Sequence, residues 1–571
     1  MMPPELQRIL LLVGLAATAY LLILAWNRDY GQDEIPVERD SAPAIFDADT
    51  LVPTDPDEEA QPRISDVPDP SLLDETDPAD VATTRPTPAE TPTNRLIEVR
   101  TPRLHVWIDR LGGDIIRVEL PLFPVSRDRP DVPFQLLDNT PGRLYVSQSG
   151  LTGPDGIDTG ESRPLFDVDQ NRFEFTDQPG EVVLRFRNGA AEIDKVFVFD
   201  PDDYAIETQY RVNNLADEPF RAALFGQIKR GDHDAPGSGA PLGIQPFVGP
   251  ALTTDDDRYN RIRFRNLRDS NLNEQVDGGW IAMLQHYFLS AWIPDQTDRN
   301  RFYGQHRADG DYVVGFIAPQ RVIAPGDTGV YSAKFYVGPK DQDRLAELAQ
   351  YLNLTVDYGF LWWLALPLFK LLQFLHGIVN NWGVAIILLT VVIKILLYPL
   401  SAASFKSMAN MRRVAPQMKR LQERYADDRQ KLSQEMMALY KREKANPLGG
   451  CLPMLLQMPV FIALYWVLFE SVELRHAPFM LWIQDLSAMD PYFILPILMG
   501  VTMYVQQSLN PPVPDPTQAK IMKIMPVFFT AIFLFFPAGL VLYWFVNNGL
   551  SILQQYIVNK QVEGKAAASK S

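Results

Sequence analysis

Apolar residues form long runs near the start and in the last third of the chain, whereas apolar and polar positions alternate in the middle. Residues 9–26 carry no charge and, at about 1.5 Å per residue, are just long enough to cross a hydrocarbon core of about 30 Å. A cleavable signal peptide is the competing interpretation, because the triplet at 17–19 has the A-x-A form of a cleavage site. More apolar residues follow the triplet and Arg8 is the only basic residue before the run, so we predict an uncleaved anchor within residues 1–28.

Short segments of alternating polarity extend over residues 95–340. Leu104, Val106 and Ile108 alternate with other side chains, as expected for a strand with one buried face. The Asn-Gly pair at 188–189 lies between two such segments and predicts a type I′ hairpin. With few helical patterns in this region, we expect one large antiparallel β-sandwich.

Apolar stretches of helical length follow the alternating region. Residues 341–380 predict connecting and interfacial amphipathic helices, because His376, Asn380 and Asn381 interrupt the apolar pattern. Five transmembrane spans are expected at 381–403, 451–474, 491–509, 521–536 and 538–558, with connecting segments at 404–450, 475–490 and 510–520 and a tail at 559–571. The expected fold is therefore a multidomain membrane protein, with an N-terminal anchor, a large periplasmic β-sandwich and an α-helical five-span core that carries a cytoplasmic helical hairpin.

Basic residues in the short loops set the expected orientation of the spans. Residues 404–446 contain eleven Lys and Arg against five Asp and Glu, and further lysines lie at 520, 523, 560, 565 and 570. Short loops rich in Lys and Arg stay in the cytoplasm. One arrangement satisfies every loop: both termini are cytoplasmic, and the β-domain and the 475–490 loop lie outside.

The charge balance differs along the chain, whose formal net charge is -17. Residues 29–94 carry 18 acidic side chains, three Arg and eleven Pro, so this segment cannot bury enough apolar surface to fold and is expected to be a disordered acidic linker. The acidic total argues against nucleic-acid binding as the main activity. A single cysteine, Cys451, excludes a disulfide framework and an iron-sulfur cluster, and the six histidines show no metal-ligand spacing. We therefore expect no metal, no cofactor and no catalytic residues.

The basic segment between the first two core spans predicts an antiparallel hairpin of two helices. Apolar residues step by three or four positions along the first helix, at Phe405, Met408, Met411, Ala415, Met418, Leu421 and Tyr425. A second apolar series follows at Leu432, Met436, Leu439 and Tyr440. Two interpretations stay open. In one, the hairpin is solvated and its apolar residues only hold its two helices together. In the other, its methionines form an adaptable contact surface and its basic flanks contact ribosomal RNA or lipid headgroups.

Polar residues recur inside the predicted spans, where each is costly. Lys394, with Thr390 one turn before it, costs about 2.5 to 3.5 kcal/mol at mid-helix and should face protein or water. Snorkelling to nearby headgroups is the alternative. The other polar positions are Gln457, Thr502, Gln506, Asn547, Ser551 and Gln554 or Gln555. Helix-to-helix hydrogen bonding explains any one of them, whereas together they predict a polar groove for substrates with Lys394 as its fixed charge.

Several segments then resemble the membrane core of the YidC insertase family of Gram-negative bacteria. They include NWGVAIILLTVVIKILLYPLS, QEMMALYKREKANPLGGCLPMLLQMPVF, DPYFILPILMGVT and FPAGLVLYWFVNN, and the resemblance covers residues 380–560. It implies a membrane protein insertase and chaperone of the inner membrane. Its implied partners are nascent inner-membrane proteins, the SecYEG translocon, SecDF and the phospholipid bilayer, with the ribosome and the signal recognition particle receptor at the cytoplasmic hairpin and basic tail.

The resemblance also assigns roles to individual positions. It places a groove charge at Lys394, where the best-known members have Arg, so the charge is kept but the bidentate fork is lost. It suggests that substrates leave along the spans at 451–474 and 521–536, with Pro459 and Phe461 lining the path. Two other function classes stay open: a polytopic secondary transporter, and a membrane-anchored periplasmic binding module. No phosphate-binding loop of the G-x-x-x-x-G-K-[ST] form occurs, so we expect no ATP-driven step.

Overall fold

The structure is a computed structural model, and it describes residues 67–68, 95–140, 142–159, 162–232, 246–425, 428–443, 452–510 and 516–568. The predicted anchor at 1–28, nearly all of the predicted linker, His233 and Cys451 lie outside the described residues. All described residues belong to one compact unit, Ile64–Ser571.

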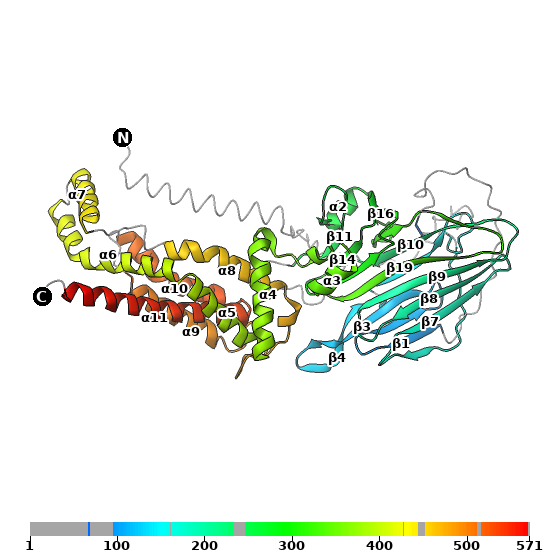
Figure 1. The fold of residues 1–571 in the computed structure, drawn as a ribbon, viewed down its shortest axis with the longest axis horizontal. Coiled ribbons are helices and arrows are strands. Elements are labelled where there is room, and N and C mark those ends of the chain that lie inside the picture. The colour runs from blue at the N-terminus through cyan, green and yellow to red at the C-terminus, as the bar shows by residue number, and fades with distance from the viewer. Residues whose placement is uncertain are drawn as a thin grey trace, which may run out of the picture. The chain divides into compact units, whose positions relative to one another are not determined.

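The middle of the chain folds into two large sheets (Figure 1). The 11-stranded sheet has the order β13-β16-β17-β10-β5-β3-β2-β1-β6, with β18 on β10 and β4 on β3, and the 8-stranded sheet has the order β12-β11-β14-β15-β19-β9-β8-β7. Paired strands are antiparallel except β1 and β6. The strands are β1 Leu96–Arg100, β2 His105–Asp109, β3 Asp114–Ser126, β4 Arg129–Leu137, β5 Tyr145–Thr152, β6 Arg172–Glu174, β7 Gly180–Arg187, β8 Ala191–Phe199, β9 Ala205–Asn214, β10 Phe220–Arg230, β11 Gly249–Leu252, β12 Asn260–Arg261, β13 Leu272–Asp277, β14 Ile281–Leu284, β15 Phe288–Ile293, β16 Arg299–His306, β17 Tyr312–Ile317, β18 Arg321–Ile323 and β19 Thr328–Pro339.

The predicted alternation is confirmed in β2, because Leu104, Val106 and Ile108 are buried while the side chains between them are half-exposed. Trp280 and Trp292 are also buried completely, and such large apolar side chains each contribute roughly 1.5–3 kcal/mol or more when removed from water. The β-sandwich therefore has a core of its own that needs no disulfide.

The hairpin at 188–189 forms between β7 and β8, but its turn type differs from the prediction. A type I′ turn needs a positive φ at both central residues, and only Gly189 has one, at 82°. The Asn188 side chain instead accepts hydrogen bonds from the backbone N–H groups of Ala190 and Ala191, at 3.1 and 2.9 Å. This local side-chain bonding stabilises a longer loop that sequence pattern alone does not distinguish from the tight turn.

One short piece of the predicted linker packs against the β-sandwich. Val67 is only 5% exposed and forms an apolar cluster with Phe225 of β10, Tyr303 of β16 and Val313 of β17. The expectation of a linker without packed residues is therefore wrong at this position. A single valine followed by proline supplies enough apolar surface for local docking, even within an acidic segment.

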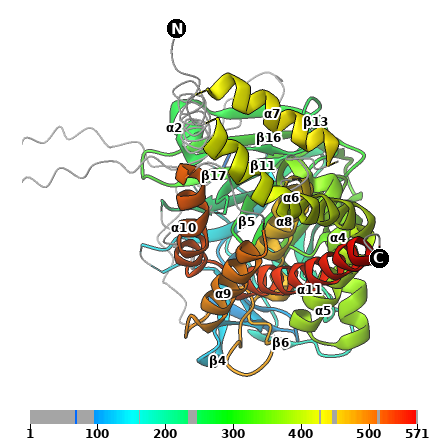
Figure 2. The ribbon, with the colours of Figure 1, turned by 90° about the vertical axis from the view of Figure 1, so that its left-hand side faces the viewer.

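Helices make up the rest of the described chain (Figure 2). They are α2 Phe264–Asp269, within the β-domain, then α3 Gln342–Leu348, α4 Trp362–Val379, α5 Trp382–Leu396, α6 Tyr398–Arg424, α7 Arg429–Arg442, α8 Leu452–Glu470, α9 Ile494–Ser508, α10 Pro516–Phe533 and α11 Ala538–Ala568. Helix α11 packs against α5, α6 and α9, whereas α4 packs against α5 and α8. These contacts place α11 at the centre of the helical core.

The first predicted core span is interrupted. Helix α5 ends at Leu396, and α6 continues from Tyr398 at an angle of 69°. Pro399 in the first turn of α6 explains the break, because proline has no N–H group and its ring clashes with a preceding carbonyl. Among the described residues one helix, Gly359–Val379, is long and apolar enough to cross a membrane alone, and this bent pair is a second candidate.

The predicted helical hairpin is formed by α6 and α7, and its seam differs from the expected stripe at one position. Val414, Met418 and Leu439 form its buried centre, with Met411 and Met436 packed beside them. The buried position is therefore Val414 rather than Ala415, which is half-exposed. A separate cluster joins the first turns of α6 to α11 through Phe405, Met408 and Val558.

Buried polar contacts join the β-domain to the helical core. The Lys340 ammonium, just after β19, lies 3.6 Å from the Glu470 carboxylate at the end of α8, and both side chains are about 95% buried, at 4% and 5% exposed. His286, between β14 and β15, donates through Nε2 to the carbonyl of Phe469 at 3.0 Å. Burial, with a smaller contribution from the nearby Lys340 ammonium, lowers the pKa of His286 to about 3. The contact is therefore made by a neutral imidazole.

We expect this histidine to make the fold less stable in mild acid. The unfolded chain takes up a proton near pH 6.5, whereas folded His286 stays neutral until about pH 3, so stability is lost as the pH falls below 6.5. The loss amounts to about 2 kcal/mol at pH 5. Thermal unfolding of the detergent-solubilised protein at pH 7.5 and pH 5 measures the effect, and His286→Gln, which keeps an N–H donor but does not titrate, should reduce the pH dependence. An equal pH dependence in both proteins would contradict the assignment.

Candidate functional site

Lys394 lies in the last turn of α5 and points into the helical core. Its side chain is 8% exposed, and Nζ donates to the hydroxyl of Ser551 on α11 at 2.6 Å. Asn381 starts α5 by accepting a hydrogen bond from the Val384 N–H at 3.0 Å, and this cap fixes where the helix begins. The ammonium is therefore directed at a neighbouring helix, whereas snorkelling would direct it outward.

The face of α11 that meets Lys394 is polar and buried. Its buried side chains are Asn548, Ser551, Gln554 and Gln555. Gln555 donates to the carbonyl of Leu509 at 3.1 Å, just after α9, whereas Asn548 Nδ2 and Gln554 Nε2 have no hydrogen-bond partner among the described residues. A buried amide without a partner costs roughly 1–3 kcal/mol, so these groups mark a place where water or a polar ligand is favoured.

The sequence analysis selected Asn547 on this helix and did not select Asn548. Asn547 is half-buried and contributes its backbone carbonyl, which accepts from the Ser551 hydroxyl at 2.8 Å. Asn548 is the buried amide. Both residues are compatible with helical spacing to Ser551, so only the position of α5 against α11 decides between them.

The remaining predicted groove residues do not bond Lys394 among the described contacts. Thr390 is buried, but its hydroxyl donates to the Ile386 carbonyl of its own helix at 2.7 Å. Thr502 on α9 likewise donates to the carbonyl of Met499 at 2.7 Å. Gln506 on α9 and Gln457 on α8 are half-buried. The structure thus brings Lys394 together with Ser551. The other predicted residues, on α5, α8 and α9, lie on helices that contact α11 but make no described bond to Lys394.

The two residues of the suggested exit path lie on α8 and differ in exposure. Pro459 is exposed. Phe461 is half-buried, and its ring packs edge-on against Trp544 of α11 at a centroid distance of 4.5 Å. Phe461 therefore packs between α8 and α11 and does not face an open path in this conformation.

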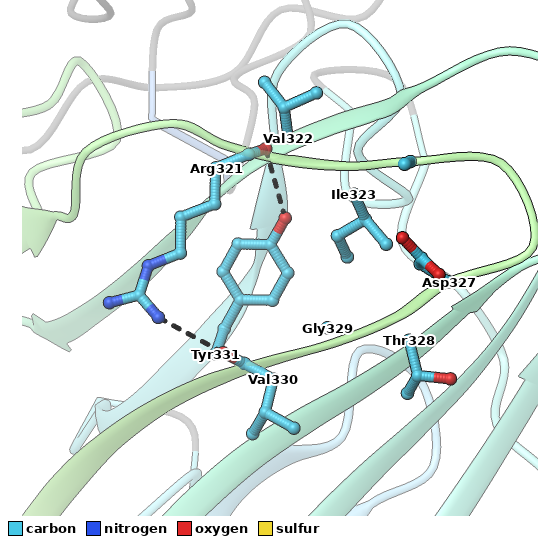
Figure 3. A pocket seen from close by; sticks show the side chains of 9 residues that line it. Arg321, Val322, Ile323, Asp327, Thr328, Gly329, Val330 and Tyr331 are labelled. Atoms are coloured by element: carbon cyan, nitrogen blue, oxygen red, sulfur yellow. Dashed lines mark hydrogen bonds between the residues drawn. The ribbon is translucent and has the colours of Figure 1, made fainter.

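A pocket of about 370 Å³ lies at the hairpin of β18 and β19 (Figure 3). Two of its polar side chains already have partners, because Arg321 Nη1 donates to the Val330 carbonyl at 3.2 Å and the Tyr331 hydroxyl donates to the Arg321 carbonyl at 3.4 Å. Arg321 also pairs with Asp298 at 2.8 Å. We assign no ligand to this pocket. Within the described residues, no group of three or more His, Cys, Asp or Glu side chains is arranged to hold a metal ion.

Comparison with known proteins gives the family of the chain. The sequence profile described as the YidC periplasmic domain matches residues 96–371, and the profile described as the 60Kd inner membrane protein matches residues 374–565. The membrane protein insertase YidC of Stutzerimonas stutzeri (strain A1501) is 47% identical over 98% of this chain and 99% of its own length. The chain belongs to the YidC membrane protein insertase family.

Further relatives agree with this assignment. The membrane protein insertase YidC of Pseudomonas fluorescens (strain SBW25) is 48% identical over 99% of each chain. Among solved structures, an active YidC insertase with its first transmembrane domain resolved is 16% identical, covers 81% of this chain and 92% of its own, and has a TM-score of 0.37. The two matched profiles give the chain the two parts of a YidC protein, a periplasmic β-sandwich domain and a helical C-terminal core.

Proposed function

We propose that this chain is an insertase and chaperone that moves membrane proteins into the inner membrane through a hydrophilic groove beside α5 and α11. The observation that carries the proposal is the buried ammonium of Lys394, which faces Ser551 and the amides of α11. A charge in such a place is costly, and a charge that is kept at this cost marks a functional site. The relatives at 47% and 48% identity are both named membrane protein insertases.

The energetics of insertion support a groove that needs no nucleotide. A substrate helix of about 20 apolar residues gains roughly 6 to 12 kcal/mol on entering lipid, so the process is favourable and its obstacle is kinetic. Carrying one carboxylate across the membrane interior costs about 3 kcal/mol. An ammonium about 4 Å from that carboxylate returns about 4 kcal/mol at an effective dielectric constant of 20. Lys394 therefore supplies enough energy to draw an acidic flank into the groove.

The proposed topology places both termini in the cytoplasm and the β-sandwich in the periplasm. The spans are the anchor near residues 9–26 and the core helices α5, α8, α9, α10 and α11, oriented by the basic segments between them. Helix α4 is proposed to lie along the membrane surface. Lys370, in the middle of α4, pairs with Asp343 of α3 at 2.5 Å, and an ion pair of this kind favours the interface over the bilayer centre.

The partners are proposed from the groove and from the cytoplasmic hairpin. Nascent inner-membrane proteins would occupy the groove, with SecYEG and SecDF beside it. The ribosome and the signal recognition particle receptor would contact the hairpin, where Arg412, Arg413, Lys419 and Arg420 are exposed on α6. Exposed basic side chains attract RNA phosphates and anionic lipids alike.

Reconstitution into liposomes tests the proposed function. We expect the purified protein to bring a small membrane protein into a protease-protected state without ATP. A variant that lacks most of residues 95–320 should keep this activity within about twofold, because the groove lies wholly in the helical core. If that deletion abolishes activity while the helical core stays folded, the β-domain is the active part and the proposal fails. A variant that moves a small solute but protects no protein would indicate a transporter instead.

A further inference from the structure

A second cavity lies where the β-domain meets the periplasmic loop of the helical core. It measures about 440 Å³ and is lined by the β3–β4 hairpin, by residues 285–287 between β14 and β15 together with Phe288 of β15, and by the loop that follows the 3₁₀ turn Val472–Leu474. Segments far apart in sequence therefore build it together. The proposed insertion groove does not use these residues.

Arg475 is fixed in the wall of this cavity. Its Nη2 donates to the carbonyls of Pro124 and Val125 at 2.8 and 3.3 Å, and its guanidinium lies over the rings of Phe134 and Phe288 at 5.4 and 5.6 Å. Its Nη1 is buried and has no hydrogen-bond partner among the described residues. Held in place by these carbonyls, the Arg475 guanidinium brings a fixed positive charge to the wall, which suits an anion.

Further groups in the cavity favour the same class of ligand. Arg117 and Arg143 reach the cavity from the β-domain with side chains that are about half exposed. Glu119 is the acidic residue of the lining, and it is already bonded to Arg117. The lining therefore keeps an excess of positive charge.

The surroundings of the cavity indicate where the anion comes from. The same loop presents Met480 and Leu481 to the surface, and Leu481 is 73% exposed. Tyr492 and Phe493 are exposed just before α9. Exposed apolar and aromatic side chains next to membrane helices are typical of residues that enter the bilayer interface. The cavity thus combines cationic side chains with apolar ones such as Val132 and Phe134, and the loop that supplies Arg475 also carries exposed apolar side chains suited to acyl chains.

We propose that this cavity binds the phosphate headgroup of an anionic phospholipid from the outer leaflet, between Arg475, Arg117 and Arg143. The leaflet follows from the proposed topology, whereas the binding chemistry follows from the cavity alone. The bound lipid would join the β-domain to the bilayer surface, because its headgroup contacts both the β3–β4 hairpin and the loop of the helical core.

Titration of the full chain in neutral detergent tests this site without any insertion assay. We expect dioctanoyl phosphatidylglycerol to bind with one-to-one stoichiometry, and dioctanoyl phosphatidylcholine to bind at least tenfold more weakly. The double variant Arg117→Gln/Arg143→Gln should bind phosphatidylglycerol at least tenfold more weakly. These arginines contribute no bond across the interface, so the variant leaves the contact between Arg475 and the hairpin intact.

Two matched variants keep the test specific. Arg129→Gln removes an exposed arginine of β4 that does not line the cavity and should leave binding unchanged, whereas Val132→Trp should block the cavity without changing its charge. Unaltered binding by the double arginine variant or by Val132→Trp would overturn the proposal. If inorganic phosphate binds with equal affinity, the site recognises phosphate alone and the lipid is not its ligand. If an acidic peptide binds selectively, the ligand is a protein segment and the lipid proposal is wrong.

Discussion

Insertion of a membrane protein with an acidic translocated end is expected to fall at least tenfold when Lys394 is replaced by alanine. The ammonium is buried against Ser551, and Lys394 is the only charged residue of α5, so its replacement leaves this helix without a cation. A tenfold change corresponds to about 1.4 kcal/mol, which is well below the roughly 4 kcal/mol available from one close ion pair. Protease protection in proteoliposomes measures the effect, with neutral-tailed substrates affected less.

Three variants separate the charge from the packing. Lys394→Met keeps most of the side-chain volume and should insert as poorly as Lys394→Ala, whereas Lys394→Arg keeps the charge and should retain activity. Ser551→Ala removes the hydrogen-bond partner alone and should reduce insertion less than either neutral variant. Lys523→Ala, at an exposed lysine of α10, is the matched control for loss of a cation. Normal insertion of acidic-tailed substrates by Lys394→Met would contradict the proposed role of the charge.

The contact between Lys340 and Glu470 is expected to give a large stability effect. Both side chains are almost fully buried, so removing one partner leaves the other as an uncompensated charge. Loss of one member of a buried pair costs about 3–5 kcal/mol. Thermal unfolding of the detergent-solubilised protein should therefore show a clear drop in the midpoint for Lys340→Met and for Glu470→Gln.

The double variant Lys340→Met/Glu470→Leu provides the control. Replacing a whole buried pair by apolar residues of similar size is often neutral or stabilising by about 1–4 kcal/mol. We therefore expect the double variant to unfold near the wild-type temperature. A double variant as unstable as the two single ones would show that the loss comes from packing at the interface, and the electrostatic explanation would be wrong.

The strands and Lys394 were predictable because each leaves a local signal in the sequence. Alternation identifies one face of β2 directly, since side chains on a strand point to opposite faces. A lysine in an apolar run is conspicuous because the bilayer makes it costly. Neither inference needs any knowledge of distant neighbours.

Other features depend on neighbours that are distant in sequence. Asn547 and Asn548 are both compatible with helical spacing to Ser551, and only packing against α5 selects the second. The break after Leu396 was missed because the apolar run continues through Pro399, so hydropathy alone extends the span. Lys340 and Glu470 lie far apart in the chain, and no local pattern in the sequence pairs them.

The packing of Val67 shortens the linker between the predicted anchor and its first point of contact with the β-domain. If the linker had no contact before β1, residues 29–94 would span at most ~240 Å when fully extended. Attachment at Val67 leaves residues 29–66, which reach at most ~140 Å. If residues 1–28 form the predicted anchor, a force on it would reach the strands that contact Val67, which are β10, β16 and β17, before it reached β1.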